Sequence, residues 1–185
     1  MTREQLEHVI RAAGSIAEED RIVIIGSQAI LGAFPHAPDS LRASMEADTF
    51  PENSPEKADI IDGCIGELSP FHETYGYYAH GVTPEAAILP QNWRTRLVTI
   101  ASPATKGYTG LCLSPADLAV SKLLAGRDKD ITFVQTMLSE NLVEPETIKE
   151  LAHELHEPHK SRLLKALVSL CQTRCETHVS RNSRT

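Results

Sequence analysis

Four consecutive apolar residues, Ile22 to Ile25, do most to constrain the fold of this chain. The run is rich in β-branched residues and too short for a helix by itself, so it predicts a buried central strand. Gly26 and Ser27 follow directly and open a short helix through residue 31. A glycine–serine turn at the start of a helix presents backbone N–H groups and a hydroxyl, an arrangement suited to holding a phosphate chain.

Two carboxylates stand two residues apart in the next extended segment, which we expect to run as a strand from Ser40 to Thr49. Because side chains alternate along a strand, Glu46 and Asp48 should project from one face, and Arg42 and Ser44 should share that face and brace the site. Two hard oxygen ligands suit Mg²⁺, which usually takes one or two protein carboxylates plus substrate phosphates. Together with the preceding turn, the pair predicts a site for a nucleoside triphosphate and its metal.

The rest of the pattern divides the chain into two halves. Helical periodicity over residues 3–18 and a Ser54-Pro55 helix start accompany further short apolar runs up to about residue 112. The additional strands are expected at residues 77–79, 87–89 and 97–100. We therefore predict an α+β fold in which residues 1–112 form a small mixed β-sheet with flanking helices.

From Ser114-Pro115 onward the pattern is helical, with Ser114 as cap and Pro115 at the first helical position. Four helices are expected, at residues 115–125, 128–139, 145–155 and 158–176. This C-terminal helical half, residues 113–176, should complete a cleft against the sheet, and a cleft between two such halves is a natural ligand site. The polar residues 177–185 are expected to be a frayed tail.

Charge and composition narrow the choice of partners. A formal net charge of −7 argues against a dedicated nucleic-acid coat protein or a protein that binds anionic membranes. The basic residues nevertheless gather in the last third of the chain, so an RNA partner would meet that half. They are Lys122, Arg127, Lys129, Lys160, Arg162, Lys165, Arg174, Arg181 and Arg184.

The polar start of the chain predicts no signal peptide, and no apolar run is long enough to span a bilayer. We therefore expect a cytoplasmic protein with no membrane partner. The chain has four cysteines without a Cys-x-x-Cys pair, which favours buried or idle thiols over a metal site. They are Cys64, Cys112, Cys171 and Cys175.

The order of Gly26-Ser27, Glu46-x-Asp48 and the stretch from Lys122 to Asp130 resembles the polymerase-β-like nucleotidyltransferase superfamily. More narrowly, it is similar to the small prokaryotic nucleotidyltransferases related to the toxins of abortive-infection toxin–antitoxin pairs. The resemblance covers most of residues 20–135. It implies the nucleotidyltransferase fold and Mg²⁺-dependent transfer of a nucleoside monophosphate from a nucleoside triphosphate to RNA, with tRNA as one acceptor, or to protein. It also implies a cognate antitoxin as a partner.

The resemblance also implies a role for each site residue. Ser27, beside Gly26, would hold the β- and γ-phosphates, while Glu46 and Asp48 would bind Mg²⁺ and act in catalysis. Lys122 would contact the triphosphate from the first helix of the second half. Arg127 follows at a helix junction and would assist it, and Asp130 is the best counterpart of the acidic residue near the end of the motif.

Other interpretations stay open. Many active members carry a third carboxylate on a later strand, but this chain has no Asp or Glu between Gln91 and Pro115. Asp130 could supply it from the helical half, the site could work with two carboxylates, or the chain could be a nucleotide-binding or interaction module that has lost turnover. A regulatory subunit or an antitoxin is a third alternative.

The acidic pair alone would also fit the solvent face of an edge strand. In the same way, Lys122, Arg127 and Lys129 alone would fit ordinary solvated helix charges.

Overall fold

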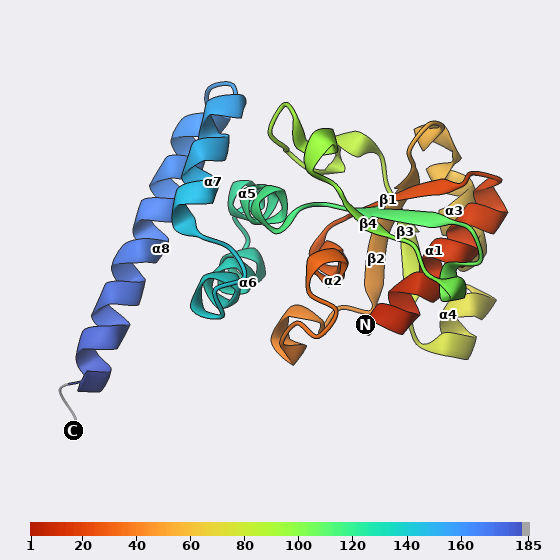
Figure 1. The fold of residues 1–185 in the computed structure, drawn as a ribbon, viewed down its shortest axis with the longest axis horizontal. Helices are drawn as coiled ribbons and strands as arrows, with labels where there is room; N and C mark the ends of the chain where they lie inside the picture. The colour runs from red at the N-terminus through yellow and green to blue at the C-terminus, as the bar shows by residue number, and fades with distance from the viewer. Residues whose placement is uncertain (183–185) are drawn as a thin grey trace.

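A five-stranded mixed sheet in the order β3-β2-β1-β5-β4 forms the centre of the N-terminal half (Figure 1). The computed structural model describes residues 1–182, without the side chains of residues 171 and 173–182. The strands are β1 (Arg21–Ile25), β2 (Glu46–Pro51), β3 (Tyr78–Gly81), β4 (Val98–Ile100) and β5 (Thr109–Cys112). β1 pairs antiparallel with β2 and parallel with β5, β2 pairs parallel with β3, and β4 pairs antiparallel with β5.

The predicted central strand is confirmed. Residues 22–25 of β1 are buried on both faces, with exposed fractions of at most 3%. Helices α1 (Arg3–Ala17) and α3 (Ala58–Ile65) pack against the sheet and against each other, and α4 (Pro70–Tyr75) follows beside β3. After β1 the chain turns through Ser27–Ala29 into the short helix α2 (Ile30–Ala33), as the glycine–serine turn predicts.

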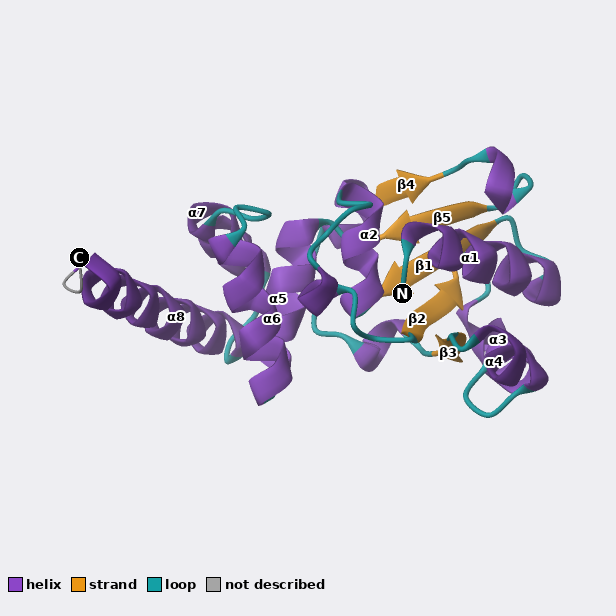
Figure 2. Ribbon diagram, turned by 90° about the horizontal axis from the view of Figure 1, so that it is seen from below, coloured by secondary structure: helices purple, strands orange, loops and turns teal. Residues whose placement is uncertain are grey.

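The C-terminal half is helical and extends from one end of the sheet, with its last helix farthest from the strands (Figure 2). It comprises α5 (Pro115–Ala125), α6 (Asp128–Ser139), α7 (Pro145–Leu151) and α8 (His159–Asn182). Ser114 caps α5 as expected, because its hydroxyl accepts a hydrogen bond from the backbone N–H of Asp117. The predicted α+β class is therefore confirmed. The division of the chain at residue 112 stays a prediction.

Two strand predictions were wrong. Residues 87–89 form no strand, and the second strand begins at Glu46 rather than at Ser40, because a 3₁₀ turn at Asp39–Leu41 precedes it. One strand was missed. β5 pairs with both β1 and β4, but its sequence Thr-Gly-Leu-Cys carries an interior glycine that normally argues against a strand. A Cβ on Gly110 would lie 2.4 Å from Ile10 Cδ1, so the glycine admits α1 onto the sheet.

Several details differ at helix ends. Ser54 does not cap its helix, since its hydroxyl donates to Glu19 instead. α8 continues to Asn182, so the segment expected to fray from residue 177 is helical that far. Among the described residues, no helix is both long and apolar enough to cross a bilayer.

The cysteine prediction is tested in part. The Cys64 thiol is exposed and Cys112 is buried, and both are free cysteines. The side chains of Cys171, Cys175, Arg174 and Arg181, and the whole of Arg184, lie outside the described part of the chain.

Candidate active site

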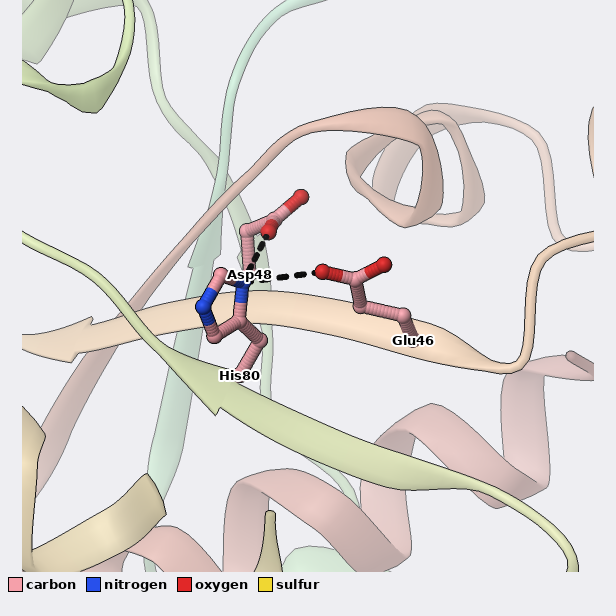
Figure 3. A group of neighbouring side chains, drawn as sticks. All are labelled: Glu46, Asp48 and His80. Atoms are coloured by element: carbon pink, nitrogen blue, oxygen red, sulfur yellow. Dashed lines mark hydrogen bonds and ion pairs between the residues drawn. The ribbon is translucent and has the colours of Figure 1, made fainter. Parts of the chain in front are cut away.

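The acidic pair lies on one face of β2, as the alternation predicts. The Glu46 and Asp48 side chains are 38% and 28% exposed, while Ala47 between them is fully buried. The neighbouring strand β3 runs parallel and places His80 opposite Asp48 in register (Figure 3). The His80 ring nitrogen Nδ1 lies 2.8 Å from Glu46 Oε1 and 3.2 Å from Asp48 Oδ1. The two carboxylates therefore share one imidazole.

The close approach of these groups shifts the pKa values of Glu46 and His80. Burial raises the pKa of Glu46, the negative charge of Asp48 raises it further, and His80 opposes both effects without cancelling them. Burial alone would lower the pKa of His80, but the hydrogen bond to Asp48 and the charges of Glu46, Asp48 and Asp62 outweigh it, so that this pKa lies above its usual value. The effect of Asp48 on Glu46 and the raised pKa of His80 both reflect a concentration of negative charge, which favours a cation at this point.

Gly26 allows the turn after β1 to lie directly against the acidic pair. Its backbone has φ +68°, an angle that residues with a Cβ rarely adopt. A Cβ at this position would lie 1.9 Å from Asp48 Oδ2. The glycine therefore meets two requirements, a conformational one and a steric one, and brings Ser27 next to the carboxylates.

Cationic side chains from α5 and the start of α6 lie on the other side of Ser27. Lys122 Nζ donates to Ser27 Oγ at 2.8 Å and to Asp130 Oδ1 at 3.0 Å. Arg127 Nε donates to the other oxygen of Asp130. Asp130 is only 1% exposed, and the two cations hold its pKa below the usual value, although burial alone would raise it. Asp130 therefore orients the two cations through both of its oxygens.

The acidic pair, the Gly-Ser turn and these cations line one cavity of about 510 Å³ between the sheet and the helical half. The charges across the cavity influence each other. Hydrogen bonding to Asp130 raises the pKa of Arg127, and the charges of Asp48 and Glu46 add to that increase. One wall of the cavity thus concentrates negative charge and another positive charge, with Ser27 between them.

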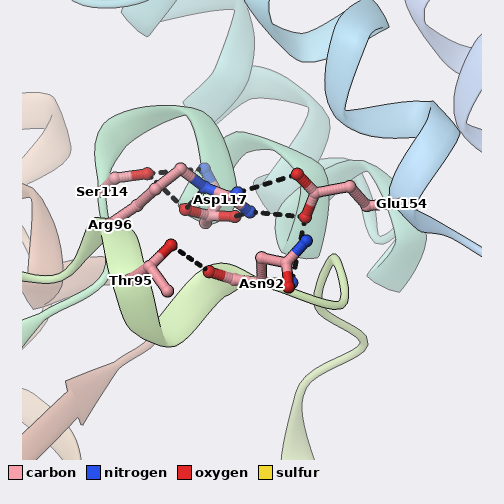
Figure 4. Close-up of polar contacts among 6 residues, drawn as sticks. All are labelled: Asn92, Thr95, Arg96, Ser114, Asp117 and Glu154. Carbon is pink, nitrogen blue, oxygen red and sulfur yellow. Dashed lines mark hydrogen bonds and ion pairs between the residues drawn. The ribbon is translucent and has the colours of Figure 1, made fainter.

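The segment between β3 and β4 supplies an apolar wall of the cavity through Val82 and residues 86–88. Arg96, at the end of this segment, donates to both oxygens of Asp117 at 2.7 and 3.0 Å and to Glu154 Oε1 at 2.9 Å (Figure 4). Asp117 is fully buried at the start of α5. The arginine therefore links this wall to the helical half through its ion pairs with Asp117 and Glu154.

Eight of the nine site residues that the sequence predicts line the cavity. They are Gly26, Ser27, Ser44, Glu46, Asp48, Lys122, Arg127 and Asp130. Arg42 is the exception. Its guanidinium donates to the backbone oxygen of Ala37 at 2.6 Å and pairs with Asp39. The expectation that it shares the face of the acidic pair was wrong because the strand begins only at Glu46. Ser44 also precedes the strand, and its hydroxyl accepts from the Glu46 N–H at 3.1 Å.

His80 is a candidate metal ligand on the cavity wall that sequence reasoning missed. The strand expected at residues 77–79 stops just before His80, whereas the observed β3 runs to Gly81 and places His80 on the same face as Tyr78. What the sequence could not give is the parallel pairing of β3 with β2 that sets His80 beside Asp48. The catalytic and binding roles of all these residues stay predictions.

The residues present fit a hard divalent cation. Glu46 and Asp48 offer carboxylate oxygens from adjacent same-face positions, both partly exposed on the cavity wall. Their surroundings already stabilise positive charge, as the raised pKa of His80 shows. Oxygen ligands of this kind suit Mg²⁺ bound together with substrate phosphates.

Comparison with known families gives one match. The model of a family described as "Nucleotidyltransferase of unknown function (DUF6036)" matches residues 4–171. No protein of curated function and no solved structure matches the chain.

Proposed function

The chain belongs to the nucleotidyltransferase family DUF6036, and from that premise we propose that it transfers the nucleoside monophosphate of a nucleoside triphosphate to a hydroxyl group. The observation that carries the proposal is the single cavity in which Glu46 and Asp48 face Lys122 and Arg127 across Ser27. In the reaction, the acceptor oxygen forms a bond to the α-phosphorus while the bond to the β-phosphate oxygen breaks. Pyrophosphate leaves and the hydroxyl proton is released.

The cationic wall would bind the triphosphate. Lys122 already holds the Ser27 hydroxyl at 2.8 Å, so the two can contact the same phosphate group. Arg127 also lines the cavity and is 61% exposed, so its positive charge would be accessible to the triphosphate. Asp130 fixes both cations before substrate arrives, which lowers the entropic cost of binding. The phosphates would therefore lie beside Ser27.

The acidic wall would hold the cation. Glu46 and Asp48 are the residues that would bind Mg²⁺, and when bound that ion neutralises the triphosphate and the leaving pyrophosphate. Gly26 keeps the turn against the Asp48 carboxylate, which aligns the phosphate-binding turn with the metal-binding face. The apolar wall at Val82 and residues 86–88 would exclude water from the opposite side of the nucleotide.

The finer assignment follows the resemblance to the toxin-type polymerase-β-like enzymes. We propose RNA as the acceptor, with a tRNA end as the first candidate, a cognate antitoxin as the protein partner, and the cytoplasm as the location. Lys160, Arg162 and Lys165 on α8 supply basic groups in the half of the chain where an RNA would approach.

Incubation with labelled nucleoside triphosphates, Mg²⁺ and total tRNA tests the reaction. Wild type should label an RNA or a protein, and the variant that combines Glu46→Gln with Asp48→Asn should not. A matched control that combines Glu56→Gln with Asp59→Asn removes two exposed carboxylates near α3 and should keep full activity. Equal labelling by wild type and the active-site variant would refute the proposed transfer.

A second function is favoured by one specific observation. Both oxygens of Asp130 are engaged by Lys122 and Arg127, so this carboxylate is not free to act as the third acidic group of the site. On that basis the chain would be a nucleotide-binding module without turnover. Calorimetry with ATP, GTP, CTP and UTP separates the two functions, because the module binds a nucleotide with Mg²⁺ and yields no labelled product.

A further inference from the structure

We propose that His80 is the third protein ligand of the divalent cation, in place of a third carboxylate. The inference rests on the proposed function only in that it assumes a cation bound by Glu46 and Asp48. It goes beyond that function because it assigns a nitrogen ligand and therefore a metal preference.

The sheet itself brings the three side chains together. Asp48 and His80 are register partners on parallel neighbouring strands, so their side chains stand next to each other on one face. Glu46 lies two residues before Asp48 on the same face of β2. Figure 3 shows both carboxylates converging on the Nδ1 side of the imidazole. Three ligands on two rigid strands need no loop rearrangement to meet a cation.

The distances match a coordination sphere. Adjacent ligand atoms around an octahedral cation lie about 2.9 Å apart, which is √2 times a bond of about 2.0–2.1 Å. His80 Nδ1 lies 2.8 Å from Glu46 Oε1 and 3.2 Å from Asp48 Oδ1. Among the described residues, these three form the one group of three or more His, Cys, Asp or Glu side chains whose ligand atoms all lie within 4.8 Å of one another.

Among the described residues, no other carboxylate joins Glu46, Asp48 and His80 in this ligand group. The segment from Gln91 to Pro115, which includes the later strands β4 and β5, contains neither Asp nor Glu. Asp130 is 1% exposed and occupied by Lys122 and Arg127. His80 is 48% exposed on the cavity wall, so coordination by its nitrogen leaves the cavity side of the cation open for phosphate oxygens.

An imidazole ligand changes which metals the site prefers. Carboxylates suit Mg²⁺ and Mn²⁺, whereas imidazole suits transition metals, whose affinity rises from Mn²⁺ through Co²⁺ to Ni²⁺. A site with two carboxylates and one imidazole should therefore favour Mn²⁺ and Co²⁺ over Mg²⁺ more strongly than an all-carboxylate site. The variant His80→Asp creates that all-carboxylate comparison within the same fold.

Mn²⁺ itself is the probe for the test. Electron paramagnetic resonance of free Mn²⁺ gives the binding constant, and electron spin-echo spectroscopy of bound Mn²⁺ detects a directly coordinated ¹⁴N nucleus. Both are measured on the full chain without a histidine tag, for wild type, His80→Ala, His80→Asp and Glu46→Gln. His153→Ala is the matched control, because that histidine is exposed in the helical half. Circular dichroism checks that each variant is folded.

Wild type and His153→Ala should bind Mn²⁺ and show ¹⁴N coupling. His80→Ala should lose the coupling and bind Mn²⁺ at least about tenfold more weakly, the lower end of what loss of even an outer-shell partner costs. His80→Asp should keep Mn²⁺ binding without ¹⁴N coupling and should lose preference for Co²⁺ over Mg²⁺ in calorimetry.

Absence of ¹⁴N coupling in wild type, or unchanged Mn²⁺ affinity and coupling in His80→Ala, overturns the assignment. If Glu46→Gln weakens Mn²⁺ binding and His80→Ala does not, His80 is not a ligand. That outcome leaves the proposed transfer reaction unaffected. If ¹⁴N coupling is present but no nucleotide transfer is found, the ligand assignment holds and the proposed reaction fails.

Discussion

Replacing Asp130 with Asn should destabilise the protein strongly, because it leaves a buried ammonium group without its counter-ion. The Lys122 and Asp130 side chains are 9% and 1% exposed and lie 3.0 Å apart. Removing one partner of a buried ion pair costs about 3–5 kcal/mol. Arg127 adds little, since it is 61% exposed and exposed pairs contribute about 0–1 kcal/mol. At about 2–4 °C per kcal/mol for a chain of this size, the melting temperature should fall by about 6–20 °C.

Thermal and urea denaturation followed by circular dichroism measure this effect. Asp128→Asn is the matched control, because it removes an exposed carboxylate from the first turn of the same helix and should cost about 0.3–1 kcal/mol. Combining Lys122→Met with Asp130→Asn removes both charges and should recover part of the lost stability. A decrease in unfolding free energy below about 1 kcal/mol for Asp130→Asn would refute the argument that the Lys122–Asp130 ion pair behaves as a buried pair.

The same pair predicts a pH dependence. Asp130 has a pKa below its usual value in the folded protein, since the hydrogen bonds from Arg127 and Lys122 outweigh the effect of burial. Its stabilising contribution is therefore fully present above the pKa of the unfolded chain and is lost as the pH falls through the lower folded value. The stability difference between wild type and Asp130→Asn should shrink from about pH 4 downward. A constant difference across that range contradicts the assignment.

Further substitutions test other parts of the structure. Gly26→Ala should cost about 1–3 kcal/mol from backbone strain and should displace the Asp48 side chain. The melting temperature and the metal affinity measured by calorimetry should then both fall, and an unchanged metal affinity would contradict this prediction. Arg96→Ala leaves the fully buried Asp117 without its cation, so the free energy of unfolding measured in urea should fall by about 3–5 kcal/mol. A fall within about 1 kcal/mol, the contribution of an exposed pair, would contradict a buried ion pair. Burial raises the pKa of the Cys112 thiol to about 12, so iodoacetamide should leave it unmodified in the folded protein and alkylate it in urea, as mass spectrometry would show.

Local patterns accounted for the parts of the site that lie close together in sequence. The β-branched run at residues 22–25 predicted the buried strand, and Gly26-Ser27 predicted the turn into α2. The alternation of Glu46 and Asp48 predicted their shared face. These features depend on side-chain periodicity and backbone freedom, which act over a few residues, so the sequence alone contains them.

Predictions from local sequence patterns failed at positions where tertiary packing determines the backbone conformation. β5 has a glycine that disfavours a strand in isolation, yet pairing with β1 and β4 and close approach of α1 make it part of the sheet. Arg42 does not line the cavity, because the chain turns before β2 and the strand alternation does not extend to this residue. Its guanidinium binds Ala37 and Asp39 instead.

Short-range patterns in the sequence therefore specified the chemical groups available to this protein: a glycine–serine turn, an acidic pair and a lysine on a capped helix. How these groups meet depends on the tertiary fold. Lys122 reaches Ser27 across 95 residues of chain, and His80 joins Asp48 through strand pairing across 32. Such contacts depend on strand register and on how the helices dock against the sheet, which are set by burial of the whole core rather than by any short pattern.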